Sequence, residues 1–245
     1  MSKRVSRSLL AIALLQFLLW ASAASAQEPQ ELEQLEPGRH ELQFEYQSLV
    51  RMTDGDAGDT HSLSVAYGVS DRLALGLELQ GERVGATFAV DTLDLSALYH
   101  FAALNEGSLK LGMKVSAGLN RHGQLAQAEV RLIAEQIGSE WWLQGNIIAE
   151  HERANGSRNF TLAYIANASH NLVSNIWLGV EVSGSMSGLA GTAEGERGHF
   201  IGPSASVEYD FSKSADVEVG AVYLARIAGT GPANSVRLFV QINFH

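Results

Sequence analysis

From residue 38 onward, apolar and polar side chains alternate along the chain with a period of two. The clearest example is the segment 73–80, where every second residue is a leucine and the residues between are Ala, Gly, Glu and Gln. A helix would distribute these leucines around its axis, whereas a strand places all of them on one face. The pattern therefore predicts β-strands with one apolar and one largely polar face.

The alternation recurs in twelve segments, each close to the roughly 9–12 residues that a tilted strand needs to cross a bilayer. Turn-forming residues such as Asn155-Gly156 separate them. The pattern is less regular in 90–101, 125–136 and 199–211, so ten strands are the alternative count. The twelve segments are 39–50, 61–69, 73–80, 90–101, 109–119, 125–136, 141–150, 159–167, 176–183, 199–211, 217–227 and 236–244.

The distribution of charge over the two faces favours a membrane barrel over a soluble sandwich. We call the alternate positions that hold the large apolar side chains the apolar parity, and the positions between them the polar parity. The apolar parity carries almost no charge, and the polar parity is mostly Gly, Ser, Ala, Asn and Gln with a few charged residues. A Lys or Arg facing the middle of a bilayer costs about 2–4 kcal/mol, and only a closed barrel leaves no strand edge unpaired in lipid. We predict a closed antiparallel up-and-down transmembrane β-barrel formed by residues 38–245.

The N-terminus indicates export. Three basic residues precede an apolar run at 9–20, and small residues at Ala24 and Ala26 fit a signal-peptidase site. We predict a cleaved signal peptide at 1–26, with an uncleaved membrane anchor as the alternative. The acidic, proline-bounded segment 27–37 is expected to be a flexible periplasmic N-terminal tail, with a brief helix as the alternative. The location that follows is the bacterial outer membrane, with membrane lipids as partners.

Charge and cysteine content narrow the classes of partner. Of 17 basic residues, three lie in the predicted signal, which leaves 14 against 27 acidic residues and a net charge of −13. This balance argues against nucleic acid, whose phosphates need a basic surface. The chain has no cysteine, so an exported protein of this kind is held by its core or by backbone pairing rather than by disulfides.

Aromatic residues on the apolar parity recur at one level of the predicted barrel. If the N-terminus is periplasmic, they fall at the periplasmic ends of their strands, as in the interfacial girdles of membrane barrels. The predicted periplasmic aromatic girdle consists of Tyr67, Tyr99, Phe101, Trp141, Tyr209, Phe211 and Phe244.

The last strand carries a resemblance to a known class. Residues 236–244 (VRLFVQINF) alternate and end in an aromatic residue, as the terminal strands of bacterial outer-membrane β-barrels do, although His245 follows the aromatic. The segment 67–73 (YGVSDRL) also resembles the short periplasmic turns of these porin-like proteins. The resemblance identifies no subfamily, and it implies that the barrel-assembly machinery recognises the C-terminal strand. The oligomeric state stays open.

A search for catalytic or metal-binding motifs finds none that would assign an activity. The chain has no nucleophile elbow, zinc-protease motif or phosphate loop. Glu150 with His151, and Asp94 with His100, could in principle support acid–base chemistry, but no nucleophile lies at a suitable spacing. We therefore expect no enzyme activity, no cofactor and no metal, and an outer-membrane enzyme is the least favoured alternative.

The charged residues on the polar parity suggest what passes through the barrel. Acidic residues outnumber basic ones by ten to five in the set predicted to line the lumen, and a water-filled lumen of this kind favours neutral or cationic solutes. We predict a small channel, with a non-conducting structural or interaction barrel as the alternative. The predicted lumen-lining residues are Glu41, Glu45, Glu78, Asp94, Lys110, Lys114, Glu129, Arg131, Glu135, Glu150, Glu181, Glu208, Glu218, Arg226 and Arg237.

Overall fold

The computed structural model describes most of the predicted barrel. Its described residues are 32–35, 38–52, 58–84, 87–103, 109–154, 157–173, 175–187, 198–229 and 231–245. The predicted signal peptide at 1–26 lies outside them, as do residues 27–31, 36 and 37 of the predicted tail. Among the described residues, no helix has the length and apolar character needed to cross a membrane.

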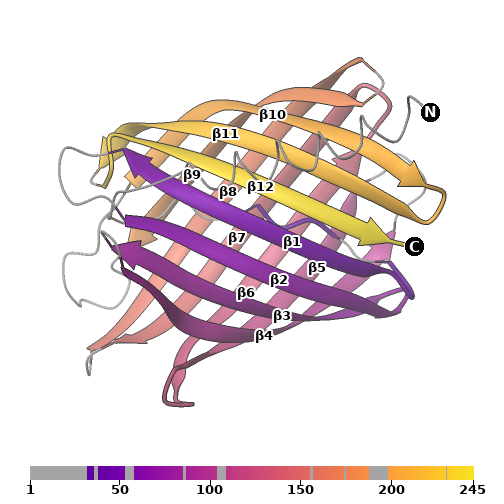
Figure 1. Cartoon of the computed structure of the whole chain (residues 1–245). Helices are drawn as coiled ribbons and strands as arrows, with labels where there is room; N and C mark the ends of the chain where they lie inside the picture. The colour runs from indigo at the N-terminus through magenta and orange to yellow at the C-terminus, as the bar shows by residue number, and fades with distance from the viewer. Residues whose placement is uncertain are drawn as a thin grey trace.

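The described residues form a barrel of antiparallel strands in which each strand pairs with its neighbours in sequence and β1 pairs with β12 (Figure 1). Because the ring is closed, none of these strands is left as an edge. The strands are β1 (Leu42–Met52), β2 (Gly58–Ser70), β3 (Leu73–Val84), β4 (Thr87–Ala103), β5 (Lys110–Asn120), β6 (Leu125–Ile137), β7 (Trp141–Ala154), β8 (Ser157–Val173), β9 (Ile176–Ser187), β10 (Gly198–Ser212), β11 (Ala215–Gly229) and β12 (Asn234–Phe244).

All twelve predicted segments are strands, so the alternative count of ten is wrong. The three less regular segments form β4, β6 and β10. Strands β4 and β8 have 17 residues each, which is more than the roughly 9–11 that cross a bilayer. Each of the three less regular strands contains a register shift, at Asp91 in β4, at Ala126 in β6 and at Phe211 in β10, and a bulge of this kind interrupts a period of two.

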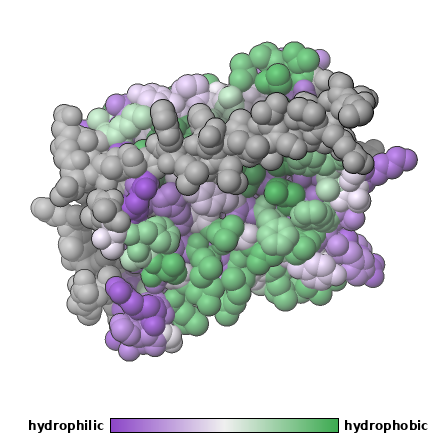
Figure 2. All heavy atoms as spheres, viewed as in Figure 1, coloured by the Kyte–Doolittle hydropathy of each residue, from purple (hydrophilic) through white to green (hydrophobic). Residues whose placement is uncertain are grey.

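The apolar parity faces outward, as predicted. Leu75, Leu77 and Leu79 of β3 remain 38–50% exposed, and large apolar side chains are exposed on every strand. Figure 2 shows such residues grouped over one side of the barrel wall. A soluble protein rarely exposes so large an apolar surface, so this face is the transmembrane surface of the barrel.

The seven residues predicted as a girdle all lie exposed near the barrel end that holds residues 42 and 244. Neighbouring pairs contact each other: the ring centroids are 6.0 Å apart in Tyr99–Phe101 and 5.3 Å apart in Tyr209–Phe211. The interfacial role of this set stays a prediction.

The seam between β1 and β12 is paired over the full length of both strands, from Leu42 with Phe244 to Met52 with Asn234. His245, the residue after β12, forms side-chain contacts at the end of this seam. The two ring nitrogens of His245 lie 3.0 Å from a carboxylate oxygen of Glu41 and 2.6 Å from one of Asp216. His245, the one departure from the terminal-strand pattern, thus links the end of β12 to β11 and to the residue before β1.

The His245 contact predicts a pH dependence of barrel stability. Its hydrogen bonds to Glu41 and Asp216 raise the pKa of His245 above the ordinary value of 6.5. The stabilisation is therefore complete below pH 6.5 and is lost as the pH rises through the raised pKa. Because the side chain is 43% exposed, solvent screening limits the effect to at most about 1 kcal/mol.

Urea unfolding of the wild type and of His245→Asn at several pH values measures this effect. We expect the wild type to be the more stable at mildly acidic pH and the difference to vanish at alkaline pH. His122→Asn, in the exposed turn before β6, is the control and should show no such trend. A difference between wild type and His245→Asn that does not change with pH would contradict the contact.

Candidate functional site in the barrel lumen

The predicted lumen residues fall into three groups by exposure. Glu208 and Arg226 are exposed, and Arg226 donates to the backbone of Gly231. The seven half-buried residues are Glu41, Glu45, Glu78, Lys110, Lys114, Glu129 and Glu150. The six buried residues are Asp94, Arg131, Glu135, Glu181, Glu218 and Arg237. The lumen set thus contains a buried charged core, and two of its members lie away from that core.

The N-terminal segment contributes an unexpected element to this lumen. The backbone N–H of Glu33 donates to Oδ1 of Asn146 on β7 at 2.7 Å, and Nδ2 of Asn146 donates to the carbonyl of Glu33 at 3.1 Å. Four residues of the predicted flexible periplasmic tail, 32–35, are therefore held inside the barrel. We call residues 32–35 the lumen segment.

Ion pairs attach the lumen segment to β5 and β6, the two strands that precede β7 in the ring. Nζ of Lys114 on β5 lies 2.7 Å from Oε2 of Glu33, and Nη1 of Arg131 on β6 lies 3.6 Å from the same oxygen. Burial alone would raise the pKa of Glu33, but Lys114 and Arg131 together hold it below its ordinary value. Glu33 is therefore an anion in the lumen, bound between two cations.

Apolar contacts anchor the segment on both sides of Glu33. Leu35 is buried against Ala74, Leu98 and Ile133, on β3, β4 and β6. A Cβ atom at Gly112 would lie only 2.4 Å from a methyl carbon of Leu35, so Leu35 fits here because residue 112 is a glycine. Leu32 packs against a second group on β7 and β8, formed by Ile148, Ala163 and Ile165. The lumen segment thus contacts strands from β3 to β8.

Sequence reasoning missed these apolar lumen positions. Leu98, Ile133, Ile148 and Ile165 lie on the parity expected to be polar, and each is buried inside the barrel. A local signal exists: each stands beside an apolar residue of the outward parity, as in Leu132-Ile133 and Ile147-Ile148. Such doublets interrupt the period of two and indicate apolar patches inside a barrel.

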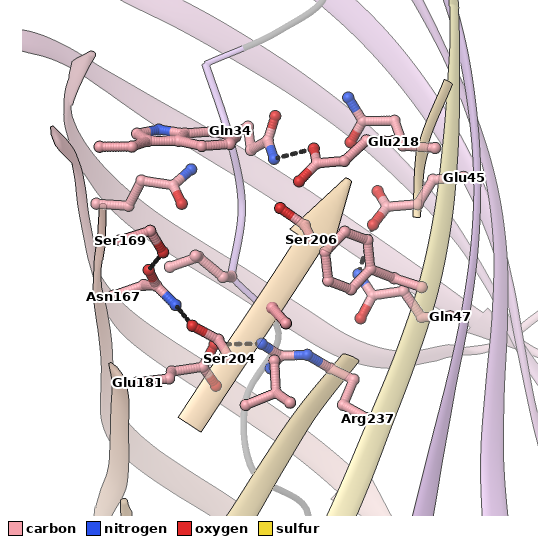
Figure 3. Close-up of a pocket in the computed structure, with 17 residues that line it drawn as sticks. Gln34, Glu45, Gln47, Asn167, Ser169, Glu181, Ser204, Ser206, Glu218 and Arg237 are labelled. Carbon is pink, nitrogen blue, oxygen red and sulfur yellow. Dashed lines mark hydrogen bonds and ion pairs between the residues drawn. The ribbon is translucent and has the colours of Figure 1, made fainter. Parts of the chain in front are cut away.

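Beside the lumen segment lies a small chamber with a volume of about 50 Å³ (Figure 3). Its lining includes Gln34 of the lumen segment and three wall carboxylates, Glu45, Glu181 and Glu218, whereas Arg237 is its one cationic side chain. Nε2 of Gln34 donates to Glu218 at 3.4 Å, and Arg237 of β12 forms a buried ion pair with Glu181 of β9. The chamber lining therefore contains more acidic than basic side chains.

Neither pair of residues considered for acid–base chemistry comes together. Glu150 and His151 are consecutive residues of β7, so their side chains point to opposite faces of the wall. Asp94 and His100 are six residues apart on β4, which separates them by ~20 Å along the strand. His100 is half-buried, and its Nε2 has no hydrogen-bond partner.

Comparison with solved structures identifies the fold of the chain. No protein-family model and no curated protein sequence matches the chain. Among solved structures, the chain is similar to an outer-membrane channel from Pseudomonas putida F1, with a TM-score of 0.57 and 17% identity over 89% of this chain and 99% of that one. The NanC porin has a TM-score of 0.54, with 8% identity over 84% of this chain and 98% of its own.

A third similar structure is the KdgM porin, with a TM-score of 0.51 and 12% identity over 83% of this chain and 98% of its own. These identities are low, and the likeness therefore concerns the course of the backbone. In each case nearly the whole length of the other chain is matched by the closed barrel described above. The chain has the fold of the porin-like outer-membrane β-barrels.

Proposed function

We propose that the protein is an outer-membrane channel for small neutral or cationic solutes. The observation that carries the proposal is the chamber in the lumen, where three carboxylates face a single guanidinium group. In a narrow, low-dielectric passage such an excess of negative charge attracts cations and repels anions. The proposal includes no catalytic step.

The location in the outer membrane is supported by the apolar outer face and by the fold. A closed ring of strands with exposed leucines on β3 satisfies its backbone hydrogen bonds within the wall and presents hydrocarbon to lipid. The barrels of similar fold include an outer-membrane channel and two porins. The cleaved signal peptide and recognition of β12 by the barrel-assembly machinery belong to the same proposal.

The size of the chamber limits what passes while the lumen segment is in place. About 50 Å³ holds only a few water molecules, because a water needs roughly 10–15 Å³ of such space. We therefore expect small conductance steps and exclusion of oligosaccharides in this state.

Single-channel recording on purified, refolded protein tests the proposal. Under a KCl gradient we expect a reversal potential of the sign for cation preference. The double variant Glu45→Gln/Glu218→Gln should move this potential toward zero, because it removes two of the three chamber carboxylates. Asp71→Asn, in an exposed turn, is the control for charge and should not move it. A preference for anions in the wild type would refute the proposed selectivity.

A second function is favoured by one observation. Residues 32–35 fill part of the lumen and pack against side chains of β3, β4, β6, β7 and β8, as expected of a structural or interaction barrel that conducts nothing. The same recordings separate the two functions. A correctly folded barrel, recognised by heat-modifiable migration on a gel, that gives no conductance steps would favour the structural function.

A further inference from the structure

Among the side chains that line the lumen chamber, the hydrogen-bond donors have partners in the protein, whereas two of the acceptors have none. Each lining side chain that carries an N–H group donates to an acceptor of the protein. For example, Nε2 of Gln47 donates to Glu45 at 2.7 Å and Nε1 of Trp142 donates to Glu135 at 3.1 Å. The full set of these donors is Gln34, Gln47, Trp142, Gln144, Asn167, Arg237 and Gln241.

Acceptors of the chamber, in contrast, are left over. Oε1 of Gln47 and Oε1 of Glu181 are buried and have no hydrogen-bond partner, and both residues line the chamber from different walls. The two residues are 7% and 0% exposed, so bulk water does not serve these oxygens. A buried acceptor without a donor is costly, and a bound group that supplies N–H donors would relieve the cost.

The lumen segment itself shows which kind of group the chamber accepts. The amide of Gln34 enters beside the wall and gives an N–H to Glu218 (Figure 3). The remaining lining carboxylates are Glu45, which receives an N–H from Gln47, and Glu181, which receives one from Arg237. With three carboxylates and one guanidinium, the chamber favours a donor that is also a cation.

The geometry distinguishes an ammonium group from a metal ion. Within the residues that the structure describes, no group of three or more His, Asp or Glu side chains converges closely enough to hold a metal ion. An ammonium group needs only hydrogen-bond acceptors in several directions, since it carries several N–H donors and no acceptor. The chamber volume of about 50 Å³ accommodates one such group.

We propose that the lumen chamber is a binding site for small primary ammonium cations, recognised by Gln47 and Glu181 through the side-chain oxygens that have no donor. The site lies on the solute path, so the proposal rests on the channel function and names the solute class that the channel selects. A solute of this class would donate N–H groups to these oxygens.

Bi-ionic recordings with ammonium chloride on one side and potassium chloride on the other, near neutral pH, test the site. We expect ammonium to be favoured about three- to tenfold, the gain of one or two hydrogen bonds that potassium cannot donate. Gln47→Met keeps the length of the side chain and removes its acceptor, and should bring the ratio close to one. Gln124→Leu, in the exposed turn before β6, is the control and should keep the wild-type ratio.

The outcomes separate this site from the channel function. A conducting wild type with equal permeability for the two ions overturns the ammonium site and leaves the channel, and so does a Gln47→Met variant that keeps the wild-type ratio. A barrel without conductance overturns the channel. In that case the heat-modifiable gel transition is followed in either salt, because a ligand that binds only the folded state stabilises it. Stronger stabilisation by ammonium chloride then supports the site, and equal stabilisation by the two salts overturns it.

Discussion

Replacement of Glu33 by lysine is expected to release the lumen segment and to raise single-channel conductance severalfold. In the wild type the Glu33 carboxylate lies 2.7 Å from Lys114 and 3.6 Å from Arg131. Lysine at this position would place a third cation among them. The ion pair is half-buried, with 14% of the Lys114 and 26% of the Glu33 side chain exposed, so its loss costs about 1.5–3 kcal/mol, as for a hydrogen bond to a charged group. A cost of that size shifts the balance between bound and released segment at least about tenfold.

Two comparisons isolate this effect. Asp71→Lys makes the same change of charge in an exposed turn and should leave the conductance at the wild-type level. Deletion of residues 32–35 should reproduce the increase seen with Glu33→Lys, because both changes empty the same part of the lumen. If both variants fold and conduct like the wild type, the lumen segment does not limit the conductance.

A substitution on the wall tests the same model without altering the segment. A Cβ at Gly112 would lie 2.4 Å from a methyl carbon of Leu35 and 3.0 Å from the carbonyl oxygen of Tyr99. Gly112→Val therefore leaves no space for Leu35 in its apolar contact, and we expect it to increase conductance as Glu33→Lys does. Unchanged conductance in a folded Gly112→Val barrel would mean that Leu35 is not an anchor.

The barrel itself could be predicted from the sequence because its determinants are local. In β3 the alternation of leucines with Ala, Gly, Glu and Gln defines the strand, its length and its outward face within eight residues. The same pattern places Glu181 and Arg237 on the inward face, and both are buried there. Since one period applies around the whole ring, even irregular strands such as β10 were recognisable from their neighbours.

The position of the lumen segment could not be predicted, because its determinants are distant in sequence. Glu33 and Lys114 are 81 residues apart, and Glu33 and Asn146 are 113 apart. No short-range pattern encodes such pairs, and an acidic, proline-bounded segment has the composition of a mobile tail. The apolar doublets Leu132-Ile133 on β6 and Ile147-Ile148 on β7 indicate apolar patches on the lumen wall. Leu35 and Leu32 pack against these patches.

Loss of Arg237 is expected to destabilise the barrel more than loss of any surface charge, by about 3–5 kcal/mol. Arg237 of β12 and Glu181 of β9 are 4% and 0% exposed and form an ion pair across the lumen. Arg237→Met leaves the Glu181 carboxylate buried without its cation, next to a wall that already carries Glu45 and Glu218. The urea midpoint and the heat-modifiable gel transition should both fall clearly.

The double variant Arg237→Met/Glu181→Met separates the cost of an unpaired charge from the value of the pair. Replacing both charged partners by apolar side chains of similar volume is often neutral or stabilising. The apolar cluster of Phe200, Val222 and Leu224 belongs to β10 and β11, which lie between the strands of the two partners in the ring. We therefore expect the double variant to recover most of the stability. A double variant as unstable as Arg237→Met would show instead that the ion pair itself holds β9 and β12 together.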